Sequence, residues 1–250
     1  DHRDLHLSIR RQRQMCIRDR IFSFWKSVKE KPIELCKGIS TIEVTLDTWR
    51  SFQKYLAPDA LKKFSILELG IAGLFLNRTN FSGIISAGPI GGMSQQSKYK
   101  INCRFNKDRL IDQIMKIAQF GSKFSVVNSD AITFLKRRVS SITSGHSLVY
   151  LDPPYYLQGK KLYRYSYQRK DHETLAKFIV RQPYPWIVSY DSHPVIRELF
   201  SGQKITSVSL DYAVKKSRKA EELLISNISL RETSYEDVKQ QSLFADFAWA

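Results

Sequence analysis

The stretch "SLVYLDPPYYLQGKK", residues 147–161, joins an apolar run to an acid, two prolines and two tyrosines. The apolar run predicts a buried strand, and Asp152 stands at its carboxyl end, where open α/β sheets bind their ligands. Pro153 and Pro154 end the strand and restrict the direction of the backbone. Tyr155 then offers a flat ring beside the acid. These residues predict a site for a planar ligand at one edge of a sheet.

The exocyclic amino group of a nucleobase fits this set of residues. Its nitrogen is a poor nucleophile, because its lone pair is delocalised into the ring. Asp152 can accept one N–H and the main-chain carbonyl of Pro153 can accept the other. Two acceptors favour a tetrahedral nitrogen and stabilise the positive charge that develops when the nitrogen is methylated. Tyr155 can stack on the base, a contact worth roughly 1–3 kcal/mol, once the base has been flipped out of a duplex.

The charge balance also favours a nucleic-acid partner. The 250 residues include 40 Lys and Arg against 24 Asp and Glu, a formal net charge of +16, which favours a polyanion. The alternative is a basic protein without such a partner. No apolar run approaches the roughly 18 residues of a membrane span, so we expect no membrane association. The three cysteines lie far apart without metal-ligand spacing, so we expect reduced thiols, no metal and a cytoplasmic location.

The two ends of the chain differ in character from the rest. The run "RQRQMCIRDR" (11–20) resembles a translated sequencing-adapter read, so we expect residues 1–20 to be a foreign head. The alternative is a basic arm that binds DNA. Residues 231–250 are interpreted as a C-terminal tail.

Residues 21–121 have a mostly helical pattern, with apolar side chains at intervals of three and four. Polar side chains at the start of a helix and glycine at its end mark the boundaries. The expected helices are 45–56, capped by Asp47 or Thr48, 65–83, ended by Gly83, and 106–120, capped by Asn106.

From residue 122 to residue 230 the pattern alternates between strands and helices. The expected strands are 123–130, 147–155, 185–191, 204–214 and 222–227, with helices at 131–139, 171–180 and 193–200. This alternation predicts an α/β fold with a largely parallel sheet. No helix separates the last two strands, so we expect them to form an antiparallel hairpin at the sheet's edge. Tyr190 and Asp191 end a strand on the ligand side, or they cap the helix that follows.

Two motifs resemble a known family. The tetrapeptide "DPPY" (152–155) after an apolar strand is similar to the catalytic motif of amino-group methyltransferases, of which the adenine-N6 enzymes carry Asp first. The segment "LFLNRTNFSG" (74–83) resembles the "LNR-x-x-F/Y-N-G" segment of the Dam-like, D12-class adenine-specific DNA methyltransferases. Segments 88–114, 186–200 and 219–227 continue in the manner of that family, so the resemblance covers about residues 21–228.

The resemblance implies a Rossmann-like class I methyltransferase sheet with a mostly helical target-recognition insertion. It implies S-adenosylmethionine as methyl donor and double-stranded DNA as substrate, and we expect the chain to act as a monomer. Residues 21–121 would then bind DNA and residues 122–230 would form the catalytic sheet. By position in the motifs, the catalytic residues are Asp152, Pro153, Pro154 and Tyr155, and Asp130 in "NSDA" contacts the donor's adenine.

The resemblance and the basic residues together suggest where DNA is contacted. Phe81 and Ser82 match positions that approach the DNA beside the flipped base, although the family's common Asn is Ser here. Arg78 binds phosphate or braces its helix. Polar and basic segments at 94–104 and 157–170 contact DNA, or they form surface loops without a partner. The basic residues assigned to DNA in these segments are Lys98, Lys100, Arg104, Lys160, Lys161 and Arg164.

One departure from the family is large. Its members begin with a "K-W-x-G-G-K" element and an "F-x-G-x-G" donor loop, and neither occurs in this sequence. We therefore expect a sheet that is incomplete at its N-terminal side and a fragment whose activity the sequence leaves open. The leading hypothesis is a site-specific adenine-N6 DNA methyltransferase. The alternatives are an RNA-adenine or N4-cytosine methyltransferase, a non-catalytic DNA-binding module, and a basic scaffold in which "DPPY" is a coincidence.

Overall fold

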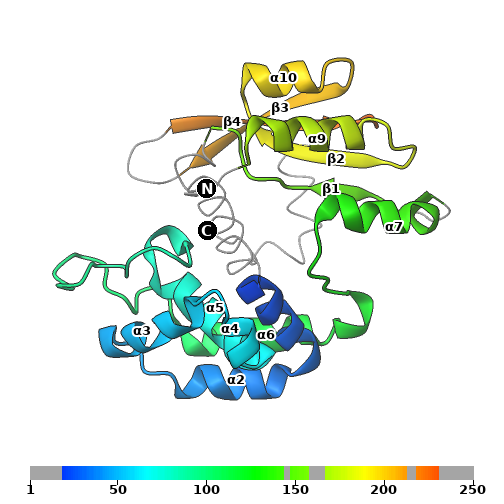
Figure 1. The fold of residues 1–250 in the computed structure, drawn as a ribbon. Helices are drawn as coiled ribbons and strands as arrows, with labels where there is room; N and C mark the ends of the chain where they lie inside the picture. Colours follow the sequence, from blue (N-terminus) through cyan, green and yellow to red (C-terminus); the bar gives the residue numbers. More distant parts are fainter. Residues whose placement is uncertain (1–18, 144–146, 158–166, 213–217, 231–250) are drawn as a thin grey trace, which may run out of the picture. The chain divides into compact units, whose positions relative to one another are not determined.

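The computed structural model describes residues 19–143, 147–157, 167–212 and 218–230. The chain divides into two compact units, Asp1–Ser129 and Asp130–Ala250. Helices make up the regular structure described in the first unit, and the second combines helices with a four-stranded sheet, so the fold is mixed α/β (Figure 1). The unit boundary follows Ser129, whereas the sequence analysis placed the start of the catalytic region at residue 122. None of the helices in these ranges is long and apolar enough to cross a bilayer.

The helical unit is built around its longest apolar helix, α5. Leu69, Phe75 and Leu76 of α5 are fully buried, and Phe75 lies 4.4 Å from Phe52, measured between ring centroids. The helices and helical turns of this unit are residues 19–30, α2 (Pro32–Thr41), α3 (Leu46–Phe52), η1 (Gln53–Leu56), α4 (Ala60–Lys63), α5 (Ile66–Thr79), η2 (Phe81–Gly83), α6 (Lys107–Ala118) and η3 (Gly121–Lys123).

Side-chain caps set the starts of three of these helices. Asn106 caps α6 as predicted, with its Oδ1 accepting a hydrogen bond from the Arg109 N–H. Ser65 and Glu68 form a capping box at the start of α5, which satisfies two main-chain donors at once. The predicted caps of α3 are wrong, because Thr45 accepts the hydrogen bond from the N–H of Thr48.

The end predicted for α5 is also wrong. The helix ends at Thr79, because the chain turns there to follow a short bridge between Asn80 and Pro89. Gly83 lies beyond it in the turn Phe81–Gly83, where Ser82 and Gly83 both have positive φ angles, 53° and 70°.

Two residues of the expected foreign head lie within the helical unit. Arg20 is fully buried and donates from Nη2 to the main-chain carbonyls of Tyr55 and Ala57, the latter at 3.2 Å. Asp19 is 5% exposed, and its Oδ1 accepts a 2.9 Å hydrogen bond from the Asn128 side chain. Residues 1–18 lie outside the described residues, so the foreign-head assignment of those residues stays a prediction.

The sheet of the second unit has the order β1-β2-β4-β3. Strand β1 pairs with β2 in parallel, and β4 pairs antiparallel with both β2 and β3. Three of the four strands therefore run in the same direction. Its strands and helices are α7 (Ala131–Thr143), β1 (Val149–Leu151), α9 (Arg169–Ile179), β2 (Trp186–Asp191), α10 (Pro194–Leu199), β3 (Lys204–Tyr212) and β4 (Arg218–Ser226).

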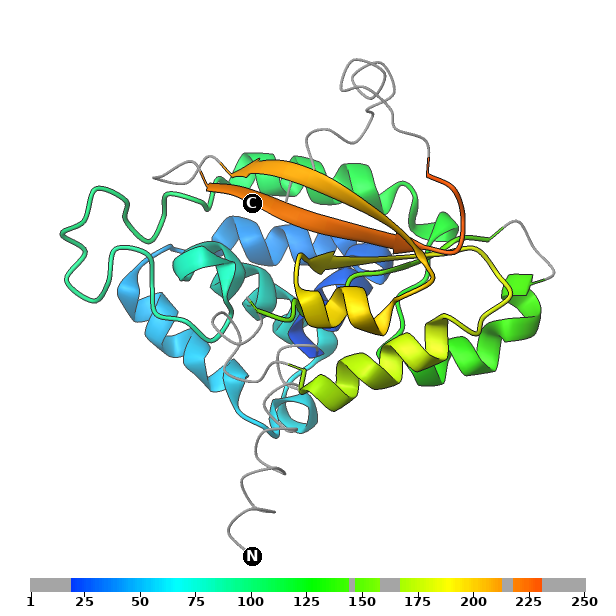
Figure 2. The same ribbon diagram turned by 90° about the horizontal axis from the view of Figure 1, so that it is seen from above.

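The last two strands confirm one expectation and refine another. They pair antiparallel from Lys204↔Ser226 to Tyr212↔Arg218, and Figure 2 shows them running side by side. The final strand, β4, lies between β2 and β3 rather than at the edge, and β3 is the outer strand.

Two strand predictions need correction. Residues 123–130 form no strand, although Phe124 has extended backbone angles of −134° and 155°, because no strand among the described residues pairs with them. The strand before Asp152 is not fully buried, since Leu148 and Tyr150 are 55% and 58% exposed. Strand β1 is an outer strand of the described sheet, and its alternate side chains on one face are not covered.

The two faces of β2 have different roles. Trp186, Val188 and Tyr190 are fully buried and pack in one apolar cluster with side chains of α9, α10 and β4. Ser189 and Asp191 alternate with them, so they point to the opposite face, and they are also buried, at 2% and 6% exposure. One face of β2 therefore packs against apolar side chains, and the other face carries two buried polar side chains.

Candidate active site

Asp152 follows the last residue of β1, at the carboxyl end of a strand that is parallel to its neighbour. Its side chain is exposed, and its Oδ1 accepts a 2.8 Å hydrogen bond from the Ser189 hydroxyl on β2. Within the ranges that the structure describes, Ser189 is the one hydrogen-bond donor recorded for this carboxylate. A carboxylate has two acceptor oxygens, so Asp152 is oriented through one and can accept a substrate N–H through the other.

The turn after Asp152 is tied to the same neighbouring strand. Pro153 is buried, and Tyr155 is half-buried beside the acid. The Asp191 carboxylate accepts two main-chain hydrogen bonds of 2.7 Å, from the N–H of Tyr156 at Oδ1 and from the N–H of Leu157 at Oδ2. Asp191 does not cap α10, because His193 does so by accepting the Val195 N–H at 3.1 Å.

Aromatic rings from α9 and from the N-cap of α10 pack against the turn. The Tyr156 ring lies 4.5 Å from His193 and 5.2 Å from His172, measured between ring centroids. His172, which the sequence analysis placed at the start of a helix, lies in α9, 1% exposed, with its Nδ1 2.9 Å from the Tyr190 hydroxyl. Burial raises the pKa of Tyr190, and the nearby Tyr167 and Asp191 raise it further.

Asp130, the acid of "NSDA", begins the second unit and directly precedes α7. It is exposed, and its Oδ1 accepts a 2.9 Å hydrogen bond from the N–H of Thr133 in the first turn of α7. An ionised carboxylate accepts several hydrogen bonds, so the same side chain suits the amino group of an adenine. It belongs to the same unit as Asp152.

In the helical unit, a pinned turn presents an exposed aromatic ring. Phe81 is 67% exposed and begins the turn Phe81–Gly83. The fully buried Asn80 side chain accepts a 2.6 Å hydrogen bond from Trp49 Nε1 and donates to the main-chain carbonyls of Ile84 and Ile85, at 3.1 and 2.7 Å. Asn80 thus connects α3 to the residues that follow the turn, by accepting one hydrogen bond and donating two, and these bonds restrict the conformation of the turn.

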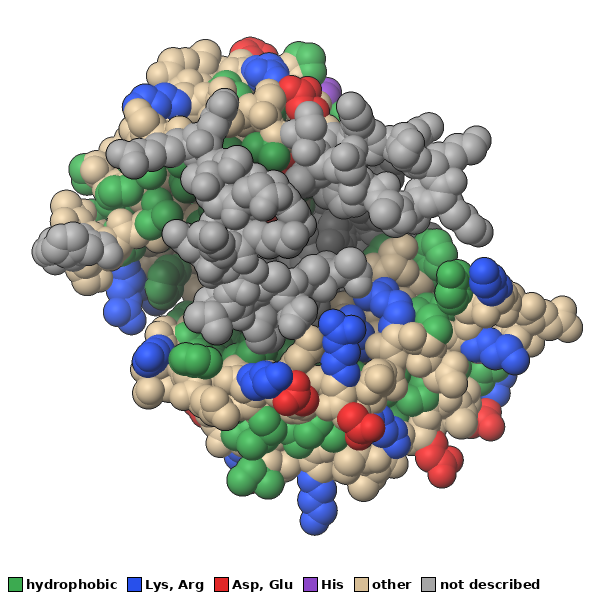
Figure 3. All heavy atoms as spheres, turned by 180° about the vertical axis from the view of Figure 1, so that it is seen from behind, with side chains coloured by type: hydrophobic (Ala, Val, Ile, Leu, Met, Phe, Trp, Pro, Cys, Tyr) green, Lys and Arg blue, Asp and Glu red, His purple; other side chains and the backbone are tan. Residues whose placement is uncertain are grey.

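Three arginines gather beside this turn. The pKa of Arg78 is lowered, first by burial and then by the positive charges of Arg104 and Arg109. Arg104 is half-buried and approaches the turn, since a Cβ at Gly83 would lie 3.8 Å from its Nη1. Positive charge on this part of the surface attracts anions such as phosphate. Figure 3 shows further Lys and Arg side chains on the surface of this unit, with acidic ones between them.

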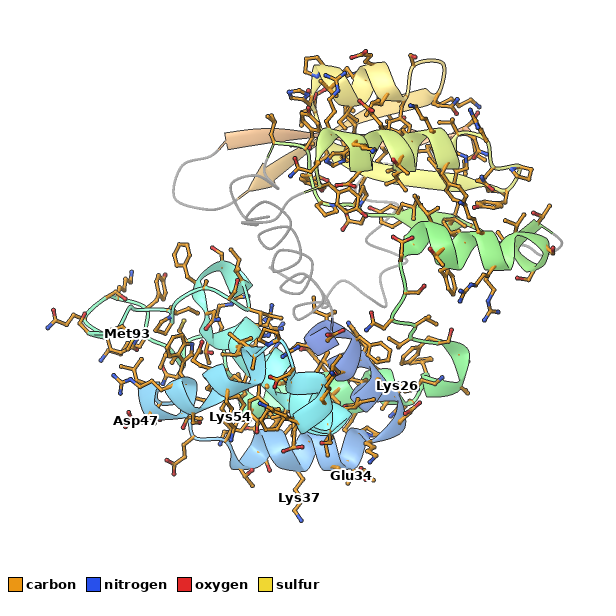
Figure 4. All side chains as sticks on the ribbon, viewed as in Figure 1. Lys26, Glu34, Lys37, Asp47, Lys54 and Met93 are labelled. Carbon is orange, nitrogen blue, oxygen red and sulfur yellow. The ribbon has the colours of Figure 1, made fainter. Side chains whose placement is uncertain are left out.

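The polar segment 94–104 forms a loop that is held by its own hydrogen bonds. Gln95 donates to the carbonyls of Ile90 and Gly92 and accepts from the N–H of Ile101, which stabilises the loop internally. Met93 is exposed on this loop (Figure 4). Lys98 and Lys100 are exposed there as well, and Lys160, Lys161 and Arg164 lie outside the described residues.

Three residues of the site, Ser189, Asn80 and Arg109, are not among those predicted from the sequence. Ser189 had a detectable signal, because "WIVSYD" places polar residues at alternate positions of an otherwise apolar strand, and buried polar side chains need partners. Asn80 and Arg109 had no comparable signal, since the Trp49 partner of Asn80 and the Arg78 neighbour of Arg109 are both about 31 positions away in the sequence.

The comparison with protein families gives one match. The model of the D12 class N6 adenine-specific DNA methyltransferase family matches residues 17–214, which include both motifs and every site residue described above. Among curated proteins, none matches the sequence.

Proposed function

The chain belongs to the D12 class N6 adenine-specific DNA methyltransferase family, and we propose that it transfers the methyl group at Asp152–Tyr155. Its reaction is the methylation of N6 of adenine in DNA, as the family establishes. The observation that supports this location is the exposed Asp152 carboxylate at the end of β1, oriented by the 2.8 Å bond from Ser189. The family gives the reaction, and we propose which residues carry it out and what each of them does.

The topology of the sheet supports a Rossmann-like methyltransferase fold. Strands β1, β2 and β3 run in one direction and only β4 is reversed, in the order β1-β2-β4-β3. In open α/β sheets the ligand lies outside the carboxyl ends of the parallel strands. Asp152 and Asp191 stand at these ends of β1 and β2, which is where a methyl-transfer site is expected. We propose the unit Asp130–Ala250 as the catalytic domain.

The chain's own groups can prepare the adenine amine for methylation. Asp152 accepts one N–H of the flipped base, and the Pro153 carbonyl accepts the other, which favours a nitrogen with an available lone pair. The negative charge of Asp152 stabilises the positive charge that the nitrogen gains during transfer. Tyr155 stacks on the base and keeps it in this orientation.

The family implies S-adenosylmethionine, which supplies the methyl group when it is bound. Asp130 is the residue that we propose to hold the amino group of the donor's adenine, because it is an exposed carboxylate in the catalytic unit that is already oriented by the Thr133 N–H. Its Oδ1 bond to the start of α7 limits the directions in which the carboxylate accepts further hydrogen bonds.

We propose the helical unit as the DNA-binding domain. Phe81, exposed on a turn pinned by Asn80, is placed to contact bases. Side chains of this kind insert between base steps in other DNA-binding proteins. Arg78, Arg104 and Arg109 supply positive charge beside the turn for the phosphate backbone, and Ser82, Lys98 and Lys100 are exposed in the same unit.

Methyl transfer from tritiated S-adenosylmethionine to unmethylated DNA of mixed sequence tests the catalytic proposal. Asp152→Ala removes the acceptor for the target amine and is expected to lower the rate on the order of 10²–10³-fold or more. DNA affinity, measured by fluorescence anisotropy, is expected to change by less than about threefold, because phosphate contacts dominate it. Asp171→Asn is the matched control, since Asp171 bonds to a main-chain N–H on the outer surface of α9.

The outcomes separate the alternatives. Methyl transfer that survives in Asp152→Ala excludes the proposed role of that residue. Mass analysis of nucleosides identifies the product, and N4-methylcytosine or methylated RNA would point to the other amino-group methyltransferases. DNA binding by the wild-type chain without any methyl transfer would favour the non-catalytic DNA-binding alternative.

A further inference from the structure

Two prolines weaken the main-chain support of the "DPPY" turn. Strand β1 pairs with β2 through Leu151↔Val188, and the pairing ends there. Proline has no N–H, so Pro153 and Pro154 offer no donors with which the backbone could continue the sheet ladder. The turn that carries the proposed catalytic residues therefore needs another means of attachment.

Side chains of β2 supply that attachment at both ends of the turn. The Ser189 hydroxyl bonds to Oδ1 of Asp152 at 2.8 Å, at the start of the turn. Asp191 accepts the N–H groups of Tyr156 and Leu157 at 2.7 Å each, at its end. These are short distances for N–H···O bonds, as expected when the acceptor is ionised.

The burial of Asp191 makes this arrangement informative. Asp191 is 6% exposed, and taking an ionised carboxylate out of water costs free energy unless it is paired or hydrogen-bonded. Each of its oxygens meets one of two successive main-chain donors, and both donors belong to the turn. A side chain needed only for packing within the sheet would not require a carboxylate that binds main-chain N–H groups 34 and 35 positions earlier in the chain.

We propose that Ser189 and Asp191 are positioning residues for methyl transfer, which rests on the proposed role of Asp152. The two side chains lie two residues apart on β2, on the face opposite the apolar cluster. Tyr190, which lies between them in the sequence, and Val188, which precedes Ser189, are both packed in that cluster. Strand β2 is therefore the support for the turn: Ser189 orients the Asp152 carboxylate, and Asp191 fixes the backbone that follows Tyr155. Small displacements of reacting groups have large effects on rate. Ser189 and Asp191 therefore affect the rate through the alignment of the Asp152 carboxylate and the Tyr155 ring.

Asp191→Asn tests the proposal with little change of volume. It replaces one acceptor oxygen by an NH₂ group that faces a main-chain donor, so one of the two turn bonds is lost. We expect kcat to fall about 10- to 100-fold while KM for DNA changes less than about threefold. We expect Ser189→Ala to lower kcat by a smaller factor and Ser189→Thr, which keeps a hydroxyl, to restore most of it.

Amide hydrogen exchange provides a readout that does not depend on activity. A peptide covering residues 152–157 contains two prolines without amides, so its exchange reports mainly on Tyr155, Tyr156 and Leu157. Asp191→Asn is expected to accelerate exchange in this peptide, and Asp171→Asn is expected to leave both exchange and kcat unchanged. Thermal unfolding of each variant verifies that the full chain is folded, and the Ser189 pair tests the proposal even if Asp191→Asn does not fold.

The failure of this proposal is distinguishable from the failure of the proposed function. Wild-type kcat and exchange in Asp191→Asn and Ser189→Ala, alongside an inactive Asp152→Ala, would overturn the positioning roles and leave the function intact. Loss of kcat without faster exchange in the peptide would also overturn them. Full activity of Asp152→Ala would refute the role of Asp152, while faster exchange in Asp191→Asn would still show that Asp191 holds the turn.

Discussion

The hydroxyl of Ser189 donates a 2.8 Å hydrogen bond to the carboxylate of Asp152, from one parallel strand to the end of its neighbour. The residues are 37 positions apart in the chain, and the parallel pairing of β1 and β2 brings them together. The bond fixes one oxygen of an otherwise exposed acid, and in the proposed mechanism the second oxygen accepts the substrate N–H. The geometry of the proposed site thus depends on the register between two strands.

The capping box of α5 is expected to contribute to the stability of the helical unit. Ser65→Ala removes the acceptor for the N–H of Glu68 and the partner of the Glu68 carboxylate, and we expect a loss of about 1 kcal/mol in the free energy of unfolding. Urea unfolding measures it. Ser51→Ala, near the end of α3, is the control and should change stability by less than about 0.5 kcal/mol.

Asn80 is expected to be more important than Asn77 for the Phe81 turn. Asn80→Ala breaks three hydrogen bonds of a fully buried side chain, and we expect destabilisation of about 3 kcal/mol. Asn77→Ala breaks the 2.8 Å bond to the Gly83 carbonyl and should cost about 1 kcal/mol. Chemical unfolding of the two variants gives the comparison, and equal costs would mean that the turn is not held by Asn80.

The arginine cluster is expected to control the salt dependence of DNA binding. Substituting Arg78, Arg104 or Arg109 by Gln should reduce the slope of log Kd against log salt concentration by about 0.9 for each phosphate contact that is lost. Anisotropy titrations at several salt concentrations measure the slope. Arg50→Gln is the matched control, because Arg50 is exposed and paired with Asp47 at 2.6 Å. A slope that changes equally in all four variants would contradict a specific phosphate site.

Alkaline unfolding is expected to involve Tyr190. Its pKa is raised above the ordinary value of 10.0, mainly by burial. The unfolded chain releases this proton near pH 10 while the folded chain retains it, so the stabilising contribution is complete below that pH and is lost as the pH rises above it. We expect Tyr190→Phe to weaken the fall in unfolding free energy as the pH rises from about 9 to about 12. Urea unfolding across this range provides the test.

Tyr190→Phe should also lower stability at neutral pH by about 1–2 kcal/mol, because it removes the hydroxyl beside the buried His172 ring. Tyr150→Phe is the control, since Tyr150 is 58% exposed on β1, and we expect it to retain the wild-type pH dependence. Identical alkaline unfolding of Tyr190→Phe and wild type would show that another group dominates.

Some features of the fold follow from local sequence patterns. The helix Lys107–Ala118 begins after the predicted cap Asn106, and its apolar residues Leu110 and Ile114, four positions apart, are buried. The antiparallel pairing of β3 and β4 was expected because no helix separates them. Caps, periodicity and short connections act over a few residues, so they can be read directly from the sequence.

Other features require partners that are distant in the chain. Residues 123–130 have a strand-like pattern but form no strand among the described residues, since a strand exists only where another strand accepts its hydrogen bonds. The position of β4 between β2 and β3 also depends on which strands form hydrogen bonds with each other. Thr45, rather than Asp47 or Thr48, caps α3, because the cap depends on where tertiary packing starts the helix.

Residue types and motifs alone predict the chemistry: an acid, two prolines and an aromatic ring at the end of a strand, in a basic chain that matches an adenine methyltransferase family. How the acid is held depends on the pairing of strands in the folded chain. Ser189 and Asp191 reach the turn because β1 and β2 are adjacent and parallel. Residue types and their spacing are local properties, whereas hydrogen bonds across a sheet depend on which strands pair and in which register.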